Sequence, residues 1–423
     1  MKRIYIFLTT LIRGIGGGHI YTLNKIHFLE KRGYATQFIH ANVLQGIINI
    51  TELAIYENNY DEALQYPCYA FSKKRQKEVL NKLLSMIPLG YDEYIIESQT
   101  IPCSTWGELL AAKLPKGKNF VYLLGEHIKI ENTRMYEFFR FKLERKELVG
   151  IDTLSLKSLF SAWYKIGQNQ NYSLPAYCTN VLSKEHYPQL SLIPQSDYTI
   201  GFVGRIDKLF VMKSLCNILR FVTVHSDKTF TLLFIGGSTN KKAENKIREY
   251  FKDIANVKIY ITGLLFPIPV DLVQKGDVYL STAGSCKISQ ELGKVTISHD
   301  GHDAMPIGLF RITTQHSLFR DKSEKPLDLI ELLDSILIKK QYVNQNVDID
   351  AVLSKYDFDY SSHMDFLESS SKELKYFDIA SASMSWQEHI KYDGAALLGI
   401  QMNNKLFNII SLPYRLKMRF FKK

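Results

Sequence analysis

The sequence predicts an α/β protein in which two parallel-sheet domains face each other across a cleft. Short runs rich in β-branched and aromatic residues alternate with helical patterns, and strands joined by crossover helices form parallel sheets. The alternation occurs twice, before and after a polar segment at 167–196 that contains many Asn, Gln, Ser and Pro residues. The length of 423 residues allows two or three domains, and 46% hydrophobic with 23% charged residues excludes a disordered chain.

The first half of the chain opens with its clearest unit. A strand at 3–10 leads into a glycine loop, a helix at 19–31 ends at Gly33, and a second strand spans 34–40. Further elements are an amphipathic helix at 72–87, strands at 93–98 and 119–124, and a helix at 134–146.

After the polar segment the alternation starts again, with strands expected at 198–203, 229–235, 257–261, 277–280 and 295–298, and helices at 211–224, at 241–251 and from near Ser285. We therefore expect a Rossmann-like domain at 1–180, a linker at 181–196, a second Rossmann-like domain at 197–375, and helices at 376–423 that cross back. Ligands in such folds bind beyond the carboxyl ends of the strands.

Composition narrows the possible partners and the compartment. Lys and Arg number 53 against 43 Asp and Glu, a net charge of +10, and 12% of residues are aromatic. This favours anionic partners such as phosphates, nucleotides or an acidic membrane face. The basic residues are dispersed without a nucleic-acid motif, so nucleic acid is not expected. Five widely spaced cysteines without a CxxC pair argue against disulfides and structural zinc and favour the cytoplasm.

The sequence predicts contact with a membrane but no transmembrane helix. No apolar run reaches 18 residues, and the apolar start is expected to be a strand because Arg13 and glycines follow it. Residues 394–423 contain no acidic residue and six basic ones, interleaved with Leu, Ile and Phe. This composition is typical of an interfacial segment on an anionic leaflet. The alternative is a closing helix whose basic face is solvated.

The glycine loop Gly14-Ile-Gly-Gly-Gly18 is the first candidate ligand site. Glycines between a strand and a helix let the backbone approach a ligand and leave helix amides free. The dinucleotide fingerprint fails at His19, and no acidic residue ends the second strand, so NAD is disfavoured. A tight turn with only a geometric role is the alternative.

Two further candidate sites follow strands of the second half. Gly204 and Arg205 come directly after the strand at 198–203, where a guanidinium can bind a diphosphate and Lys208 or Lys213 can add charge. The alternative is a group of surface cations near a strand end.

In the third candidate site, Gly284 and Ser285 begin a helix whose amides point at the cleft. Glu291, farther along, can accept two ribose hydroxyls; the alternative is a glutamate on the helix surface. Another loop, His299-Asp-Gly-His-Asp303, contains metal-binding residue types, but its spacing matches no common zinc signature, so no metal site is expected.

Taken in order, these motifs resemble those of GT-B glycosyltransferases of the family-4 type (glycosyl transferases group 1). The matching pieces are Gly16-Gly17-Gly18-His19, Val203-Gly204-Arg205, Leu233–Gly237, Asn256–Gly263, Asp277–Ser281 and the pair Gly284 and Glu291, spread over about residues 3–310. Two positions depart from the family pattern. The first glutamate of the family's Glu-seven residues-Glu motif falls on Ala283, and the phosphate-binding lysine falls on Phe210, so that Lys208 or Lys213 must substitute.

The resemblance implies a GT-B enzyme that transfers a hexosyl unit, with retention, from a nucleotide-diphosphate sugar and needs no bound metal or other cofactor. The N-terminal domain is then the acceptor side and the C-terminal domain the nucleotide-sugar side. His127 follows the strand at 119–124, where such enzymes often place a histidine against the sugar or the acceptor; a capping role is its alternative. The implied catalytic residues are His127, Arg205 and Lys208, and the implied donor-binding residues are Gly16, Gly17, Gly18, Gly204, Lys213, Gly284, Ser285 and Glu291.

The implied acceptor is a lipid-linked glycan or an oligosaccharide in the synthesis of a bacterial surface polysaccharide, such as capsule or lipopolysaccharide. The basic tail would then hold the enzyme at the cytoplasmic face of the cell membrane. Two alternatives stay open: a non-catalytic scaffold on the same fold, favoured by Ala283, and a sugar-nucleotide epimerase.

Overall fold

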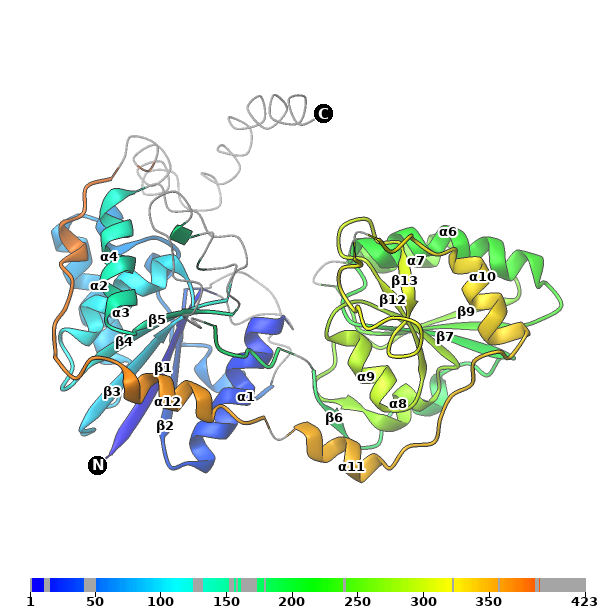
Figure 1. The fold of residues 1–423 in the computed structure, drawn as a ribbon, viewed down its shortest axis with the longest axis horizontal. Helices are drawn as coiled ribbons and strands as arrows, with labels where there is room; N and C mark the ends of the chain where they lie inside the picture. Colours follow the sequence, from blue (N-terminus) through cyan, green and yellow to red (C-terminus); the bar gives the residue numbers. More distant parts are fainter. Residues whose placement is uncertain are drawn as a thin grey trace.

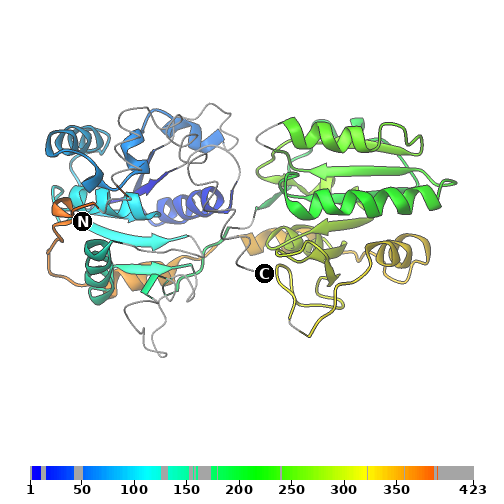
Figure 2. The same cartoon turned by 90° about the horizontal axis from the view of Figure 1, so that it is seen from above.

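The computed structural model describes residues 2–10, 16–41, 51–124, 132–151, 173–178, 180–238, 241–321, 323–356 and 358–384, together with 156, 159, 160 and 388. The chain folds into two lobes, each a mainly parallel sheet with helices on both faces (Figure 1). Figure 2 shows the two lobes side by side from above. The predicted fold class, two Rossmann-like α/β domains, is confirmed.

The sheet of the first lobe has five parallel strands in the order β2-β1-β3-β4-β5. The first four begin and end within two residues of the predicted ranges, while the three residues of β5 are too few to show a period. The bounds are β1 Arg3–Thr9, β2 Ala35–His40, β3 Glu93–Ser98, β4 Lys118–Leu123 and β5 Leu148–Gly150.

Alternating residues of β1 divide the core of this lobe into two. Ile4, Ile6 and Leu8 pack with α2, α3 and α4 on one face, and Tyr5 and Phe7 pack with α1 and α12 on the other. The helices are α1 Gly17–Lys31, α2 Lys73–Ser85, α3 Ile101–Ala111, α4 Thr133–Glu144 and α12 Ser361–Ser369. Because α1 begins at Gly17, the glycine loop contributes the first turn of this helix.

The sheet of the second lobe has six strands in the order β13-β12-β11-β7-β8-β9, and only β13 runs antiparallel to its neighbour. The strands are β7 Tyr198–Val203, β8 Phe230–Ile235, β9 Val257–Ile261, β11 Val278–Ser281, β12 Val295–His299 and β13 Pro306–Leu309. The helices are α6 Leu209–Val224, α7 Lys241–Tyr250, α8 Val270–Gln274, α9 Ser285–Glu291, α10 Leu329–Leu333 and α11 Ile349–Leu353. The short strands β6 Leu182–Ser183 and β10 Ile268–Pro269 pair with each other.

The chain returns to the first lobe earlier than the sequence predicts. Tyr360, Met364 and Leu367, at and within α12, belong to the core of the first lobe, and Figure 1 shows α12 beneath that lobe. The range 197–375, assigned from sequence to the second domain, therefore includes a helix that packs on the first. The nine residues of α12 hold only two buried apolar side chains, Met364 and Leu367, which is too weak a pattern to assign the helix to either lobe from sequence.

Among the residues that the structure describes, no helix has the length and hydropathy needed to cross a bilayer. The basic segment at 394–423 lies outside the described residues, so its membrane contact stays a prediction.

A buried ion pair lies at the centre of the first lobe. Lys25 Nζ on α1 is 2.5 Å from Glu97 Oε2 on β3, and neither side chain is exposed. The hydroxyls of Tyr5 and Tyr21 donate to the same carboxylate at 2.6 Å and 2.9 Å. The carboxylate thus receives a charged donor and two neutral donors, which replace the water it loses on burial.

His363 of α12 contacts this pair from the return segment. Its Nδ1 lies 3.0 Å from Lys25 Nζ. An ammonium can only donate, so Nδ1 accepts and carries no proton. Nε2–H then donates to the carbonyl oxygen of Pro175 at 2.8 Å. Burial, followed by the charge of Lys25, lowers the pKa of His363 far below its usual range. The neutral imidazole ties α12 to α1 and to the segment at 173–178.

Removal of one partner of the ion pair tests its role. We expect Lys25→Met to reduce the free energy of unfolding by about 3–5 kcal/mol, because it leaves an unpaired buried carboxylate. The double variant Lys25→Met/Glu97→Gln should recover most of this loss. Urea unfolding followed by tryptophan fluorescence measures both. The control is Arg75→Met, which breaks an exposed i,i+3 pair with Glu78 and should cost less than about 0.5 kcal/mol. Equal losses in Lys25→Met and the control would contradict the assignment.

A second buried histidine makes the second lobe sensitive to acid. His299 ends β12 without solvent exposure, with its ring 5.2 Å from that of Phe210 and its Nε2 3.4 Å from Ser214 Oγ. Burial lowers the pKa of His299 to about 4, against about 6.5 in an unfolded chain. As the pH falls through this window, the unfolded state binds a proton that the folded state does not, so stability decreases with falling pH.

The pH dependence of unfolding should therefore change in a His299→Gln variant. Between about pH 5.5 and about pH 4.5, the free energy of unfolding of the natural chain should fall about 1.2 kcal/mol per pH unit more steeply than that of the variant. Urea titrations at several pH values measure the two slopes. Because the slopes are compared, any loss of packing in the variant does not affect the result. Parallel slopes would show that His299 titrates normally in the folded protein.

Candidate functional site

A cavity of about 440 Å³ lies between the two lobes. The start of α1 forms its wall on the first lobe together with Ala176, Cys178 and Asn180 of the segment that crosses between the lobes. The loops that follow β7, β8, β9 and β11 form its wall on the second lobe. In the second sheet the chain order reverses between β7 and β11. Such a switch point opens a crevice at the carboxyl ends of the strands, where ligands of α/β proteins bind. We call this space the interdomain cavity.

Close backbone contacts shape the wall of the cavity on the second lobe. Gly204 has a φ of +113°, and a Cβ atom there would lie 3.0 Å from Ser285 Oγ. At Gly236 a Cβ atom would lie 1.9 Å from the carbonyl oxygen of Gly204. Glycine is therefore required at both positions. The loops after β7, β8 and β11 approach one another closely at Gly204 and Gly236. Because glycine has no side chain, a ligand can reach the backbone at these two positions.

Two cations reach this cavity. Arg205 is half exposed and its Nε is 3.2 Å from Asp207 Oδ1, while Lys208 lies at the start of α6. Burial, followed by the positive charge of Arg205, lowers the pKa of Lys208 from its usual range. No acidic residue is among the described residues that line the cavity. An anion placed between the two cations would relieve their repulsion, so this wall has the electrostatics of a phosphate site.

The loop after β11 is fixed by hydrogen bonds to the loop after β13, which carries Ser317. Ala283 has a φ of +54°, which a residue other than glycine rarely adopts, and its N–H donates to the carbonyl oxygen of Ser317 at 2.6 Å. Thr282 Oγ1 donates to the carbonyl oxygen of His299 at 2.9 Å. The helix α9 begins directly after this loop, at Ser285. Its first amides, together with Arg205 and Lys208, stay the predicted source of the positive field.

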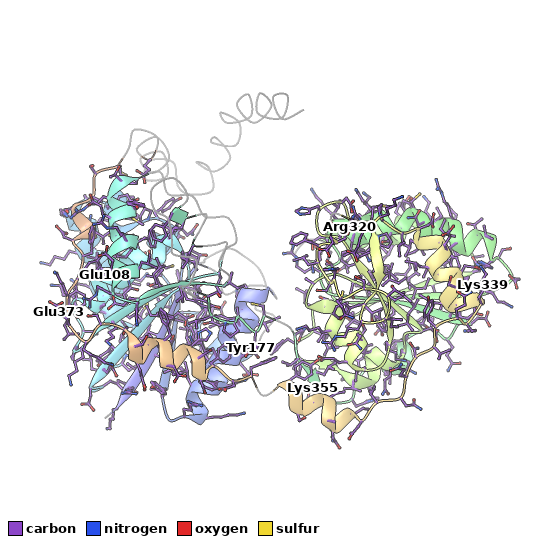
Figure 3. All side chains as sticks on the ribbon, viewed as in Figure 1. Glu108, Tyr177, Arg320, Lys339, Lys355 and Glu373 are labelled. Atoms are coloured by element: carbon purple, nitrogen blue, oxygen red, sulfur yellow. The ribbon has the colours of Figure 1, made fainter. Side chains whose placement is uncertain are left out.

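The wall on the first lobe consists mainly of small and apolar groups, with Asn180 as its polar residue. Gly16 and Gly17 line it together with Cys178, and a Cβ atom at Gly17 would lie 3.0 Å from that of Cys178. Next to this wall the two chain crossings meet, since the rings of Tyr177 and Phe358 stack at 4.8 Å. Figure 3 shows Tyr177 on the side of the first lobe that faces the second. Small residues at this wall leave room for a ligand beside the two segments that cross between the lobes.

The structure brings together most of the predicted site residues but not all of them. Those that line the interdomain cavity are Gly16, Gly17, Gly204, Arg205, Lys208, Gly284 and Ser285. Gly18 borders a different, smaller pocket. Lys213 donates to the carbonyl oxygen of Asp303 at 2.9 Å, and Glu291 accepts from the hydroxyl of Tyr356 at 2.8 Å. Neither is among the lining residues. His127 lies outside the described residues.

The sequence analysis did not predict part of the lining. Ala176, Cys178 and Asn180 come from the crossing segment, and Leu264 and Leu265 follow β9. No local pattern marks the crossing segment as a cavity wall, because only the packing of two distant domains places it there. For Leu264 and Leu265, the local signal in the sequence is Gly263, which directly precedes them after β9.

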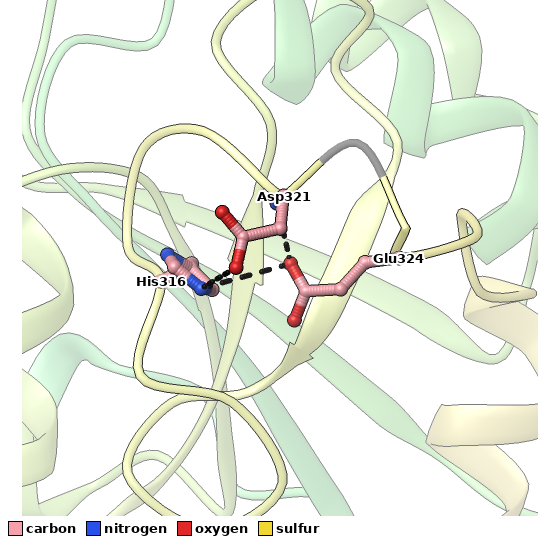
Figure 4. A group of neighbouring side chains, drawn as sticks. All are labelled: His316, Asp321 and Glu324. Atoms are coloured by element: carbon pink, nitrogen blue, oxygen red, sulfur yellow. Dashed lines mark hydrogen bonds and ion pairs between the residues drawn. The ribbon is translucent and has the colours of Figure 1, made fainter.

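Two groups of metal-binding residue types lie outside the interdomain cavity. In the loop at 299–303 the rings point to different neighbours, His299 to Phe210 and His302 to Phe319, so they do not converge. His316, Asp321 and Glu324 do converge in the loop after β13 (Figure 4). His316 Nε2 is 3.2 Å from Asp321 Oδ2, and the N–H of Asp321 donates to Glu324 at 2.7 Å. These contacts close the loop that carries Ser317.

Comparisons with known proteins identify the fold. No family model and no curated protein sequence matches the chain. Among solved structures, a glycosyltransferase from Rickettsia africae is 14% identical, with 88% of this chain and 94% of that chain covered and a TM-score of 0.52. The Anabaena protein HepE, solved with UDP and glucose, is 10% identical over 86% and 99%, with a TM-score of 0.50. A UDP-GlcNAc 2-epimerase from Neisseria meningitidis is 13% identical over the same shares, with a TM-score of 0.43. At these identities the likeness concerns the fold alone, and that fold is GT-B, two Rossmann-like domains that face each other across a cavity.

Proposed function

We propose that the protein is a glycosyltransferase whose donor is a nucleotide-diphosphate sugar. The observation that carries this proposal is the interdomain cavity, in which Arg205 and Lys208 face small and apolar groups and no acidic residue is among the described lining residues. A diphosphate supplies the two negative charges that this wall lacks. The apolar wall of Ile20 and Leu265 suits the flat faces of a base and a sugar.

In the proposed reaction the bond between the sugar and the diphosphate breaks while positive charge grows on the sugar and negative charge on the leaving phosphate. Arg205 and Lys208 stabilise the leaving group, because both are in place before the charge develops. Gly204, Gly284 and Ser285 approach the donor through backbone and hydroxyl groups, with Gly16 and Gly17 opposite. His127 remains the proposed contact to the sugar or the acceptor. Approach of the lobes would exclude water, which otherwise hydrolyses the donor.

The proposal needs no metal, because two protein cations already supply the positive charge at the leaving group. Retention of configuration and a hexose donor rest on the family resemblance. Glu291 and Lys213 stay proposed donor-binding residues, although neither lines the cavity: Glu291 Oε2 accepts from Tyr356, and Lys213 donates to the carbonyl oxygen of Asp303.

We propose that the acceptor of the sugar lies at a membrane. The proposed acceptor is a lipid-linked glycan or an oligosaccharide in the synthesis of a bacterial surface polysaccharide, such as capsule or lipopolysaccharide. The support is the family resemblance and the basic, acid-free sequence at 394–423. This segment would hold the enzyme at the cytoplasmic face, beside an acceptor that cannot leave the bilayer.

A scaffold without catalytic activity is the second candidate. Ala283 favours it, because the alanine takes the place of the glutamate expected there and lines the cavity without a functional group. Such a protein would bind a nucleotide sugar and leave it unchanged. A sugar-nucleotide epimerase, the third candidate, would convert its substrate without an acceptor.

Nucleotide binding tests the cavity. Arg205→Ala and Lys208→Met should each weaken the binding of a nucleoside diphosphate by about 10- to 150-fold, the range for one hydrogen bond to a charged group. Isothermal titration with UDP and GDP measures this effect. The control is Arg220→Ala, which removes an exposed arginine of α6 that does not line the cavity. If both site variants bind like the control, the cavity is not a diphosphate site.

Turnover separates the three candidates. The full chain is incubated with a panel of nucleotide sugars, with and without lipid-linked glycan extracted from bacterial membranes. A transferase releases nucleoside diphosphate faster when the acceptor is present. An epimerase isomerises the sugar equally well without it, and a scaffold does neither, so either outcome would overturn the proposal.

Vesicle binding tests the tail. We expect the full chain to sediment with vesicles rich in phosphatidylglycerol but not with phosphatidylcholine vesicles, and to be released as salt rises. Each basic residue near the surface contributes about 1 kcal/mol. A variant with Arg415, Lys417 and Arg419 replaced by glutamine should therefore bind at least tenfold more weakly. A matched variant with Lys241, Lys242 and Lys246 of α7 replaced serves as control. Equal sedimentation of the two variants would locate the membrane contact elsewhere.

A further inference from the structure

Two loops outside the interdomain cavity support a loop that lines it. Residues 282–284 follow β11 and line the cavity; we call them the β11 loop. We call residues 300–305, which follow β12, the β12 loop, and residues 310–321, which follow β13, the β13 loop. No residue of the β12 loop or the β13 loop is among the described lining residues. These two loops can therefore act on a bound ligand only through other residues.

Two consecutive carbonyl groups of the β13 loop bind its two neighbours. The N–H of Ala283 donates to the carbonyl oxygen of Ser317, and the N–H of Gly301 donates to that of Leu318, both at 2.6 Å. Gly301 permits this close approach, since a Cβ atom there would lie 2.9 Å from Leu318 Cδ1. The β13 loop therefore fixes the β11 loop and the β12 loop relative to each other.

The β11 loop has a conformation that needs such support. The φ of Ala283 is +54°, in the left-handed region that is strained for a residue with a Cβ atom. Strained backbone persists where surrounding contacts hold it in place. Here the contacts are the bond from Ala283 N–H to Ser317 and the bond from Thr282 Oγ1 to the carbonyl oxygen of His299. The shape of this part of the cavity wall thus depends on the place of Ser317.

Asp300 joins the β12 loop to the β13 loop. It is 4% exposed. Its Oδ2 accepts the backbone N–H of Arg320 at 3.0 Å, and its Oδ1 accepts those of His302 at 2.7 Å and Asp303 at 3.4 Å. Burial alone would raise the pKa of this carboxyl, but the three N–H groups and the charge of Arg320 outweigh it and hold the pKa below its usual range. The side chain is therefore a charged acceptor, which makes these hydrogen bonds strong.

The β12 loop also holds a proposed donor-binding residue. Lys213 donates to the carbonyl oxygen of Asp303 at 2.9 Å, and the side chain of Asp303 pairs with Arg320 of the β13 loop. Lys213 and the β11 loop thus both depend on the segment that Asp300 organises.

We propose that Asp300 is a positioning residue of the nucleotide-sugar site. Its carboxylate fixes the β13 loop through Arg320 N–H, and the carbonyl group of Ser317 in that loop holds the β11 loop in the conformation that faces the donor. Asp300 itself is not among the lining residues, so it acts through these backbone contacts. This role rests on the proposed assignment of the interdomain cavity to the donor.

Two measurements on the full chain test the proposal. Hydrogen-exchange mass spectrometry without nucleotide follows the amides of residues 282–287, and isothermal titration follows the binding of UDP and GDP. In Asp300→Ala, we expect the amides at 282–287 to exchange faster while those of β7 and β8 are unchanged, because the opening is local. The affinity for the nucleoside diphosphate that binds should fall about 2- to 30-fold, the range for residues that act through a contact network.

The conservative variant Asp300→Asn tests the two-sided contact. An amide has one oxygen, so it can accept from the β12 loop or from the β13 loop but not from both. We therefore expect exchange at 282–287 and nucleotide affinity between those of the natural chain and of Asp300→Ala. A general loss of stability would instead raise exchange in β7 and β8 as well.

Two further variants keep the result interpretable. Asp197→Ala is the matched control, since Asp197 Oδ2 accepts the N–H of Thr229 at 2.8 Å at the opposite end of the same sheet; both readouts should stay unchanged. Phe319→Ala serves if Asp300→Ala does not fold, because Phe319 is exposed and its ring stacks on that of His302 at 4.4 Å, between the β13 and β12 loops. It should also speed exchange at 282–287. Unchanged exchange there in the site variants, or nucleotide affinities equal to that of Asp197→Ala, would overturn the proposal.

The outcome is separable from that of the proposed function. Exchange is measured without nucleotide, so it tests the hold on the β11 loop even if neither UDP nor GDP binds. In that case the donor assignment fails, and exchange at 282–287 decides whether Asp300 positions the loop. If a nucleotide binds and Asp300→Ala changes neither readout, the inference about Asp300 fails alone.

Discussion

The first lobe depends on one ion pair that has no contact with water. Lys25 and Glu97 lose their hydration on folding, so each must find all of its partners inside the protein. A pair of this kind is often no more stabilising than apolar side chains of the same volume. We infer that its main contribution is specificity. Tyr5 on β1, Tyr21 on α1 and Gln99 after β3 all donate to the carboxylate of Glu97, so the pair fixes these three elements relative to one another.

The same pair explains why the chain must come back to the lobe where it starts. Lys25 donates a hydrogen bond to His363 Nδ1, and His363 Nε2–H donates one to the carbonyl oxygen of Pro175 in the crossing segment. Residues from three distant parts of the chain therefore complete one network. The stacked rings of Tyr177 and Phe358 lie where the outgoing and returning crossings meet. Both crossings between the lobes therefore lie beside this network.

Local patterns predict the backbone of this protein better than they predict where its side chains point. β1 to β4 and the turn at Gly204 depend on neighbouring residues and are found from sequence. Which side chains of a helix face the cavity depends on the residue at which the helix begins. Because α6 begins at Leu209, Lys208 lies beside the cavity and Lys213 turns towards another loop. Glu291 lies at the far end of α9, roughly 9 Å along the axis from its first residue. α3, which is buried nearly all round, shows no stripe and is missed.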